Sequence, residues 1–171
     1  MASGKTTFGR ALARKYGWNF VDLDEEIERN TGRKVADIIR EEGEERFRAL
    51  ESETLKTTAL LRKTIVACGG GTPCFFDNME FMTLHGQTLW LVATPERIAE
   101  RITVAGATRP LAANREGETL TAHVRRHLFQ RQQYYARANF RLSGERLEDE
   151  REIAEAVEKV PEEIAEILRA R

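Results

Sequence analysis

The stretch Ala2-Ser3-Gly4-Lys5-Thr6-Thr7 lies near the start of the sequence and decides the expected fold. Ser3 to Thr6 match the second half of the phosphate-binding loop G-x-x-x-x-G-K-[ST], in which backbone N–H groups at a helix N-terminus hold phosphate oxygens. Apolar residues at helical spacing follow, which predicts a helix to about Tyr16 that stops at Gly17. The stretch therefore predicts a phosphate site at the start of a helix.

The first half of this loop is not in the sequence. Its first glycine would stand five positions before Gly4, which is upstream of Met1. In proteins with this loop, the strand that delivers it lies in the middle of the sheet. Without that strand a domain would expose two unpaired strand edges and a large apolar gap. We expect that about ten residues, enough for a strand of five or six residues and the start of the loop, precede Met1.

Short strands alternate with helices along the rest of the chain. Strands are predicted at residues 20–24, 64–68, 88–92 and 140–142, and helices at 25–30, 35–42, 44–62, 77–85, 95–103, 120–138, 148–159 and 162–169. This alternation predicts an α/β fold in three layers, a parallel sheet with helices on both faces. At 171 residues the chain is expected to form one domain, residues 1–171. Ligands of such a fold bind at the carboxyl ends of the strands.

Composition excludes several classes of function. Lys and Arg total 27 and Asp and Glu total 28, a net charge of −1, so the chain has no basic excess to attract nucleic acid or an anionic membrane. No apolar run approaches the ~18 residues that span a bilayer. The two cysteines, Cys68 and Cys74, match neither a disulfide framework nor a zinc motif. We therefore expect a cytoplasmic protein with reduced thiols.

Five further motifs follow the loop in a fixed order. They are Asp22-x-Asp24, Phe47-Arg48-x-x-Glu51, Gly69-Gly70-Gly71-Thr72-Pro73, Arg109-Pro110-Leu111 and Arg131-x-x-x-Tyr135. Each one alone has an ordinary structural explanation: a helix cap, a surface ion pair, a loop that needs positive φ, a solvated arginine. Together with Ser3-Gly4-Lys5-Thr6-Thr7, the ordered set resembles the shikimate kinase family along nearly the whole chain.

The resemblance implies a phosphate-loop kinase fold with a substrate-binding region at about residues 24–62 and a lid loop at about residues 104–118. It implies Mg²⁺-dependent transfer of the γ-phosphoryl group of ATP to the 3-hydroxyl of shikimate. The products are ADP and 3-phosphoshikimate, on the route to chorismate and the aromatic amino acids. Shikimate and ATP would be the binding partners of a chain expected to be monomeric.

The resemblance also assigns roles to single residues. Lys5, Asp24 and Arg109 would be catalytic, because phosphoryl transfer needs cations on the phosphate and a group that orients the attacking hydroxyl. Thr6 and Asp22 would hold Mg²⁺. ATP would contact Ala2, Ser3, Gly4, Lys5, Thr6, Thr7, Arg101 and Arg109. Shikimate would contact Asp24, Phe47, Arg48, Gly69, Gly70, Gly71 and Arg131, with the two arginines on its carboxylate. Phe47 is alternatively a plain core side chain.

Other functions stay open at the level of the residues. A sibling phosphate-loop kinase would act on gluconate, also a polyol acid, or on a nucleoside monophosphate, which would need a slot for its base. A non-catalytic nucleotide-binding regulator would keep the loop but lose a catalytic position, whereas every candidate position is filled here. A purely structural domain would bind no nucleotide.

Overall fold

The computed structural model describes residues 2–104 and 118–170. Its strands are β1 (Asn19–Asp22), β2 (Thr64–Ala67), β3 (Leu89–Val92) and β4 (Phe140–Ser143). Its helices are α1 (Lys5–Tyr16), α2 (Leu23–Thr31), α3 (Val35–Thr57), α4 (Asn78–His85), α5 (Pro95–Val104), α6 (Leu120–Tyr135), α7 (Glu150–Glu158) and α8 (Glu162–Arg169). The alternation predicted from the sequence is confirmed.

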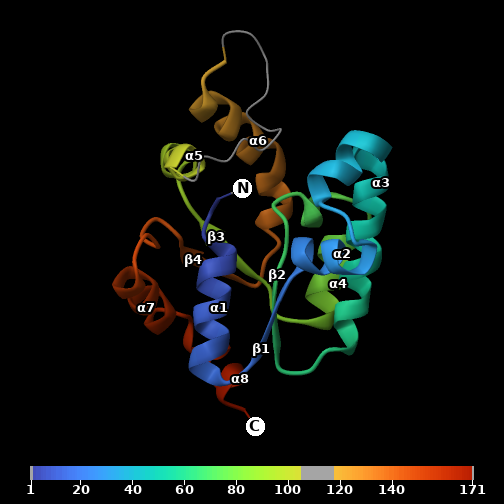
Figure 1. Cartoon of the computed structure of the whole chain (residues 1–171). Coiled ribbons are helices and arrows are strands. Elements are labelled where there is room, and N and C mark those ends of the chain that lie inside the picture. The colour runs from blue at the N-terminus through green and yellow to red at the C-terminus, as the bar shows by residue number, and fades with distance from the viewer. Residues whose placement is uncertain (1, 105–117, 171) are drawn as a thin grey trace.

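The strands form two separate parallel pairs in the described part of the chain. β1 pairs with β2 in the register Asn19 to Thr64, and β3 pairs with β4 in the register Leu89 to Phe140. The expected parallel pairing is therefore present, but β2 and β3 do not pair with each other. A cavity of about 1040 Å³, lined by both strands, lies between them. The three-layer arrangement is thus built around a divided sheet, with α1 in front of the two strand pairs in Figure 1.

Three clusters of apolar side chains hold the layers together. The largest joins α1, α7 and α8 to the β3–β4 pair, with Phe8, Leu91 and Leu168 at its centre. A second cluster closes α2 against α3, and a third closes α5 against α6. Burying each such side chain contributes about 1.5–3 kcal/mol. The α2–α3 pair therefore has a core of its own, and Figure 1 shows it beside β1 and β2, away from α7 and α8.

Several boundaries differ from the sequence prediction by a few residues, and two of the differences affect the site. The strand predicted over residues 20–24 ends at Asp22, because the Asp22 side chain accepts the N–H of Asp24 and caps α2. The helices predicted at 35–42 and 44–62 are one element, α3, that is broken at Gly43 with φ 88° and ψ 166° and ends at Thr57. The break falls where the sequence analysis separates the two helices.

The predicted lid loop lies almost wholly outside the described residues, as does Arg109. Among the helices that the structure describes, none is long and apolar enough to cross a membrane.

Candidate active site

The phosphate loop residues begin α1 as expected. Gly4 stands before the helix with φ 87°, a left-handed conformation that favours glycine. The Lys5 ammonium donates to the Ser3 hydroxyl at 3.3 Å, and the Thr6 hydroxyl donates to Asp22 Oδ2 at 2.7 Å. Thr7 is exposed on the first turn. The helix N-terminus, the lysine and the threonine hydroxyl are therefore on one side of the fold, at the carboxyl end of β1.

Asp22 links the phosphate loop to the next helix. One of its oxygens accepts from Thr6, and the other accepts the backbone N–H of Asp24 at 3.1 Å. The two predicted metal ligands, Thr6 and Asp22, are thus in contact, and both offer oxygen, which Mg²⁺ prefers. Asp24 lies in the first turn of α2, where its Oδ1 would lie 3.6 Å from a Cβ added to Gly69. The carboxylate of Asp24 therefore approaches the glycine turn that follows β2.

Two of the three glycines at residues 69–71 are required by space. A Cβ on Gly71 would lie 2.6–2.7 Å from the guanidinium of Arg48, and one on Gly69 would lie 2.7 Å from Glu51 Oε1. Both distances are too short for any side chain, so the arginine and the glutamate could not keep their places. None of the three glycines has positive φ, so a loop that needs positive φ is the wrong explanation for them.

Arg48 is held from several directions. Its Nη1 donates to Glu51 Oε2 at 2.8 Å, and its Nη2 donates to Glu44 Oε1 at 2.9 Å. Its guanidinium carbon lies 4.9 Å from the ring centroid of Phe47 and 4.5 Å from that of Phe75. Burial lowers the pKa of Arg48, but the two glutamates outweigh it and the pKa is raised above its ordinary value. The Glu51 contact expected from the i,i+3 spacing is present.

Glu51 belongs to a buried polar network that sequence reasoning missed. The Thr72 hydroxyl donates to Glu51 Oε1 at 2.6 Å, Asn78 Nδ2 donates to the Thr72 carbonyl at 2.9 Å, and the Ser52 hydroxyl donates to Asn78 Oδ1 at 2.7 Å. Glu51, Thr72 and Asn78 are fully buried. The network fixes the glycine turn to α3. Thr72 stood in a quoted motif, but Ser52 and Asn78 carried no signal in the sequence.

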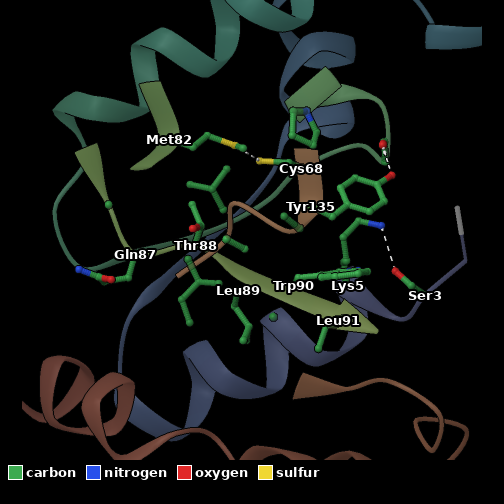
Figure 2. A pocket seen from close by; sticks show the side chains of 18 of the residues that line it. Ser3, Lys5, Cys68, Met82, Gln87, Thr88, Leu89, Trp90, Leu91 and Tyr135 are labelled. Atoms are coloured by element: carbon green, nitrogen blue, oxygen red, sulfur yellow. Dashed lines mark hydrogen bonds between the residues drawn. The ribbon is translucent and has the colours of Figure 1, made fainter. Parts of the chain in front are cut away.

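α6 brings Arg131 and Tyr135 to the same turn. The Tyr135 hydroxyl donates to the carbonyl of Gly70, a contact drawn in Figure 2. Burial raises the pKa of Tyr135, while Arg131 acts to lower it. Burial likewise raises the pKa of the Cys74 thiol, against the positive charges of Arg131 and Arg48. Arg131 stands one helical turn before Tyr135 on α6, so it lies on the side of the helix that meets the glycine turn.

Two other predicted residues have clear surroundings. Phe47 is 4% exposed and packs with Ile27 and Ile38, so in this structure it is a core side chain with Arg48 against its ring. Arg101 Nη2 lies 2.8 Å from Glu148, and its Nη1 donates to the Gly144 carbonyl at 2.8 Å. Arg101 therefore joins α5 to the segment that follows β4.

The fold and the site define a class of protein. The sequence Gly-Lys-Thr stands at the start of a helix beside parallel strands. Carboxylates follow one strand and a glycine turn follows the next. This arrangement is that of a phosphate-loop phosphotransferase. The sequence model of one such family, shikimate kinase, matches residues 1–162. The chain therefore belongs to the shikimate kinase family, which consists of ATP-dependent kinases.

Individual relatives agree with this assignment. The shikimate kinase of Phocaeicola vulgatus is 40% identical over 160 residues, 94% of this chain and 91% of the relative. That of Parabacteroides distasonis is 38% identical over 163 residues, 94% of each chain. Among solved structures, shikimate kinase from Bacteroides thetaiotaomicron gives a TM-score of 0.88 at 35% identity, covering 99% of this chain and 94% of that one. Shikimate kinase from Acinetobacter baumannii in complex with shikimate gives 0.83 at 28% identity, covering 98% and 89%.

Proposed function

We propose that this chain transfers the γ-phosphoryl group of ATP to the 3-hydroxyl of shikimate, with Mg²⁺, as a single-domain cytoplasmic monomer that binds no nucleic acid. The observation that carries the proposal is the meeting of two sets of groups at the carboxyl ends of β1 and β2. One set, Lys5, Thr6 and Asp22, suits phosphates and a cation. The other set, Arg48 and Arg131, suits a small carboxylate: Arg48 lies against Gly71, and Arg131 stands one helical turn before Tyr135, which bonds to the Gly70 carbonyl.

The phosphate side rests on the N-terminus of α1. Backbone N–H groups of residues 2–7 and the Lys5 ammonium would neutralise the β- and γ-phosphates. Thr6 and Asp22, whose side-chain oxygens lie 2.7 Å apart, would hold Mg²⁺, which would offset the negative charge of the transferring phosphate. Two protein oxygens are enough for such an ion, and within the described ranges His, Cys, Asp and Glu form no cluster of three or more that could hold a metal.

The acceptor side rests on Asp24 and the arginines. Asp24 would accept a hydrogen bond from the 3-hydroxyl and aim its oxygen at the phosphorus; removing the proton is secondary, because the transition state of phosphoryl transfer is loose. Arg48 and Arg131 would grip the carboxylate with their planar forks. Arg109 would add a positive charge to the transferring phosphate, and Arg101 would lie against adenine. Residues 24–62 would form the substrate-binding region and residues 104–118 the lid.

ADP release measured with ATP and Mg²⁺ tests this proposal. Shikimate, gluconate and a nucleoside monophosphate are offered in parallel to the 171-residue chain, and to a chain extended ahead of Met1 by an apolar strand and a complete phosphate loop. We expect ADP with shikimate alone, lost when Mg²⁺ is chelated.

Two lysine variants control the assay. Lys5→Met is expected to abolish turnover, whereas Lys15→Met, at the far end of α1, is expected to keep it. The proposal would be overturned if ADP formed with gluconate or the nucleotide but not with shikimate. It would also be overturned if the protein were folded and formed no ADP with any of the three acceptors at either chain length.

A further inference from the structure

The guanidinium of Arg48 is shared between a buried carboxylate, Glu51, and an exposed one, Glu44. Its Nη1 donates to Glu51, which is fully buried and also receives the Thr72 hydroxyl. Breaking that contact would leave a buried carboxylate without its cation, which is costly. The edge formed by Nε and Nη2 donates instead to a single oxygen of Glu44, at 3.2 Å and 2.9 Å. The edge formed by Nε and Nη2 can therefore be given to a ligand without removing the cation from Glu51.

The carboxylate of Glu44 can leave Arg48 at little cost. The Glu44 side chain is 60% exposed, whereas that of Arg48 is 11% exposed. A carboxylate that returns to water from such a pair loses little, because exposed i,i+4 ion pairs are weak. Glu44 also directly follows Gly43, the residue at which α3 departs from helical geometry. The carboxylate is thus attached next to a break in the helix and not in the middle of a rigid turn.

We propose that Glu44 occupies, in the ligand-free protein, the place on Arg48 that the carboxylate of the acceptor takes on binding, and so sets the affinity for that carboxylate. This inference rests on the proposed function, because it takes Arg48 to bind the acceptor's carboxylate. The two carboxylates compete for one edge of one guanidinium, so the apparent affinity for the acceptor is reduced by the strength of the Glu44 contact. Glu44 acts through Arg48 and is a positioning residue.

Glu44→Gln is the test, since the amide keeps the shape and removes the charge. We expect the KM for shikimate to fall about two- to fivefold, the range set by an ion pair of this kind. The KM for ATP serves as the internal comparison and should not move. Glu45→Gln, an exposed neighbour with the same loss of charge, is the matched control. If Glu44 had only a structural role in α3, Glu44→Gln would change the midpoint of unfolding and leave the KM for shikimate unchanged.

A double-mutant cycle separates the possible failures. In an Arg48→Met background, the further change Glu44→Gln should have no effect on the KM for shikimate, because the shared partner is gone. If Arg48→Met weakens shikimate but Glu44→Gln does not strengthen it, the inference about Glu44 is wrong and the proposed function stands. If Arg48→Met leaves the KM for shikimate unchanged, the carboxylate role of Arg48 fails and the inference about Glu44 fails with it.

Discussion

The Thr72 hydroxyl shows how one buried atom can control a charged neighbour that contacts the ligand site. It donates to Glu51 at 2.6 Å, and Glu51 in turn holds Arg48. We expect Thr72→Val to destabilise the protein by about 1–3 kcal/mol, because a buried carboxylate oxygen loses its donor. Because Arg48 then loses its fixed orientation, the KM for shikimate should also rise.

Denaturant unfolding and steady-state kinetics measure the two effects. Thr72→Ser keeps the hydroxyl and should restore both the stability and the KM to near their original values. A valine variant with unchanged stability would show that the Glu51 contact contributes nothing.

At the scale of elements, the break in α3 depends on one glycine. Gly43 has φ 88° and ψ 166°, a region that residues with a Cβ rarely adopt. We expect Gly43→Ala to lower the free energy of unfolding by about 1–3 kcal/mol, since the alanine must either strain the backbone or rebuild the join between the two parts of α3.

Gly86→Ala is the matched control for this prediction. Gly86 has φ −170° and ψ 176°, an extended conformation open to any residue, and a Cβ there would approach only the Met82 carbonyl, at 3.9 Å. Chemical denaturation of both variants checks the difference. Equal stabilities for the two alanine variants would mean that the backbone at Gly43 adapts without cost.

In the molecule as a whole, the two strand pairs are separated by the cavity between β2 and β3, which we call the slot. Trp90 of β3 faces Tyr135 of α6, whereas Leu91 packs in the cluster with α1, so the strand presents apolar side chains to both layers. Figure 2 shows Ser3 and Lys5 beside Trp90 and Tyr135 around this space. A strand placed here would therefore have two partners for its backbone and apolar helices on both faces.

An apolar extension tests what this space accepts. We expect a strand of about five aliphatic residues, joined ahead of Met1 by a short loop, to raise Tm by roughly 5–15 °C. Each buried side chain contributes about 1.5–3 kcal/mol, against about 1.5 kcal/mol of conformational entropy per residue. Calorimetry of this chain, beside one carrying a Gly/Ser extension of equal length, measures the effect. Equal Tm values for the two extended chains would show that the slot does not accept a strand.

The stability of the fold should also depend on the protonation of His127. Burial lowers the pKa of His127 to about 4, and Arg131, His123 and Arg126 act in the same direction while Glu118 opposes them. In the unfolded chain the imidazole titrates near pH 6.5. Between about pH 6.5 and 4 the unfolded state therefore binds more protons, and the free energy of unfolding falls as the pH falls.

Replacing the imidazole removes this contribution. We expect His127→Gln to lose stability less steeply than the parent protein between pH 6.5 and pH 4, in urea unfolding at stepped pH. His85→Gln, which alters an exposed ring at the end of α4, should keep the steeper slope. A His127→Gln curve parallel to that of the parent would contradict the depressed pKa.

The sequence predicted the end of α1 correctly, since Gly17 ends the helix in the left-handed conformation, with φ 68°. It did not predict why glycines follow the strand at residues 64–67, where Arg48 and Glu51 occupy the space of a Cβ at Gly71 and Gly69. The position of Asp24 was harder to predict. Its carboxylate follows a predicted strand, but Asp22 had already ended that strand by capping α2, and a cap can form at either of two nearby carboxylates.

The alternation of strands and helices, the phosphate loop and the order of the charged motifs follow from the amino-acid sequence alone, because these features depend on spacing along one chain. The contacts between distant groups come from the tertiary fold: Ser52 with Asn78, Tyr135 with Gly70, and Arg101 with the segment after β4. The tertiary fold also decided that the sheet is divided into two pairs. The physical reason is that hydrogen bonds and packing between distant segments depend on how helices and strands are placed in space, and no local pattern of residue types records that placement.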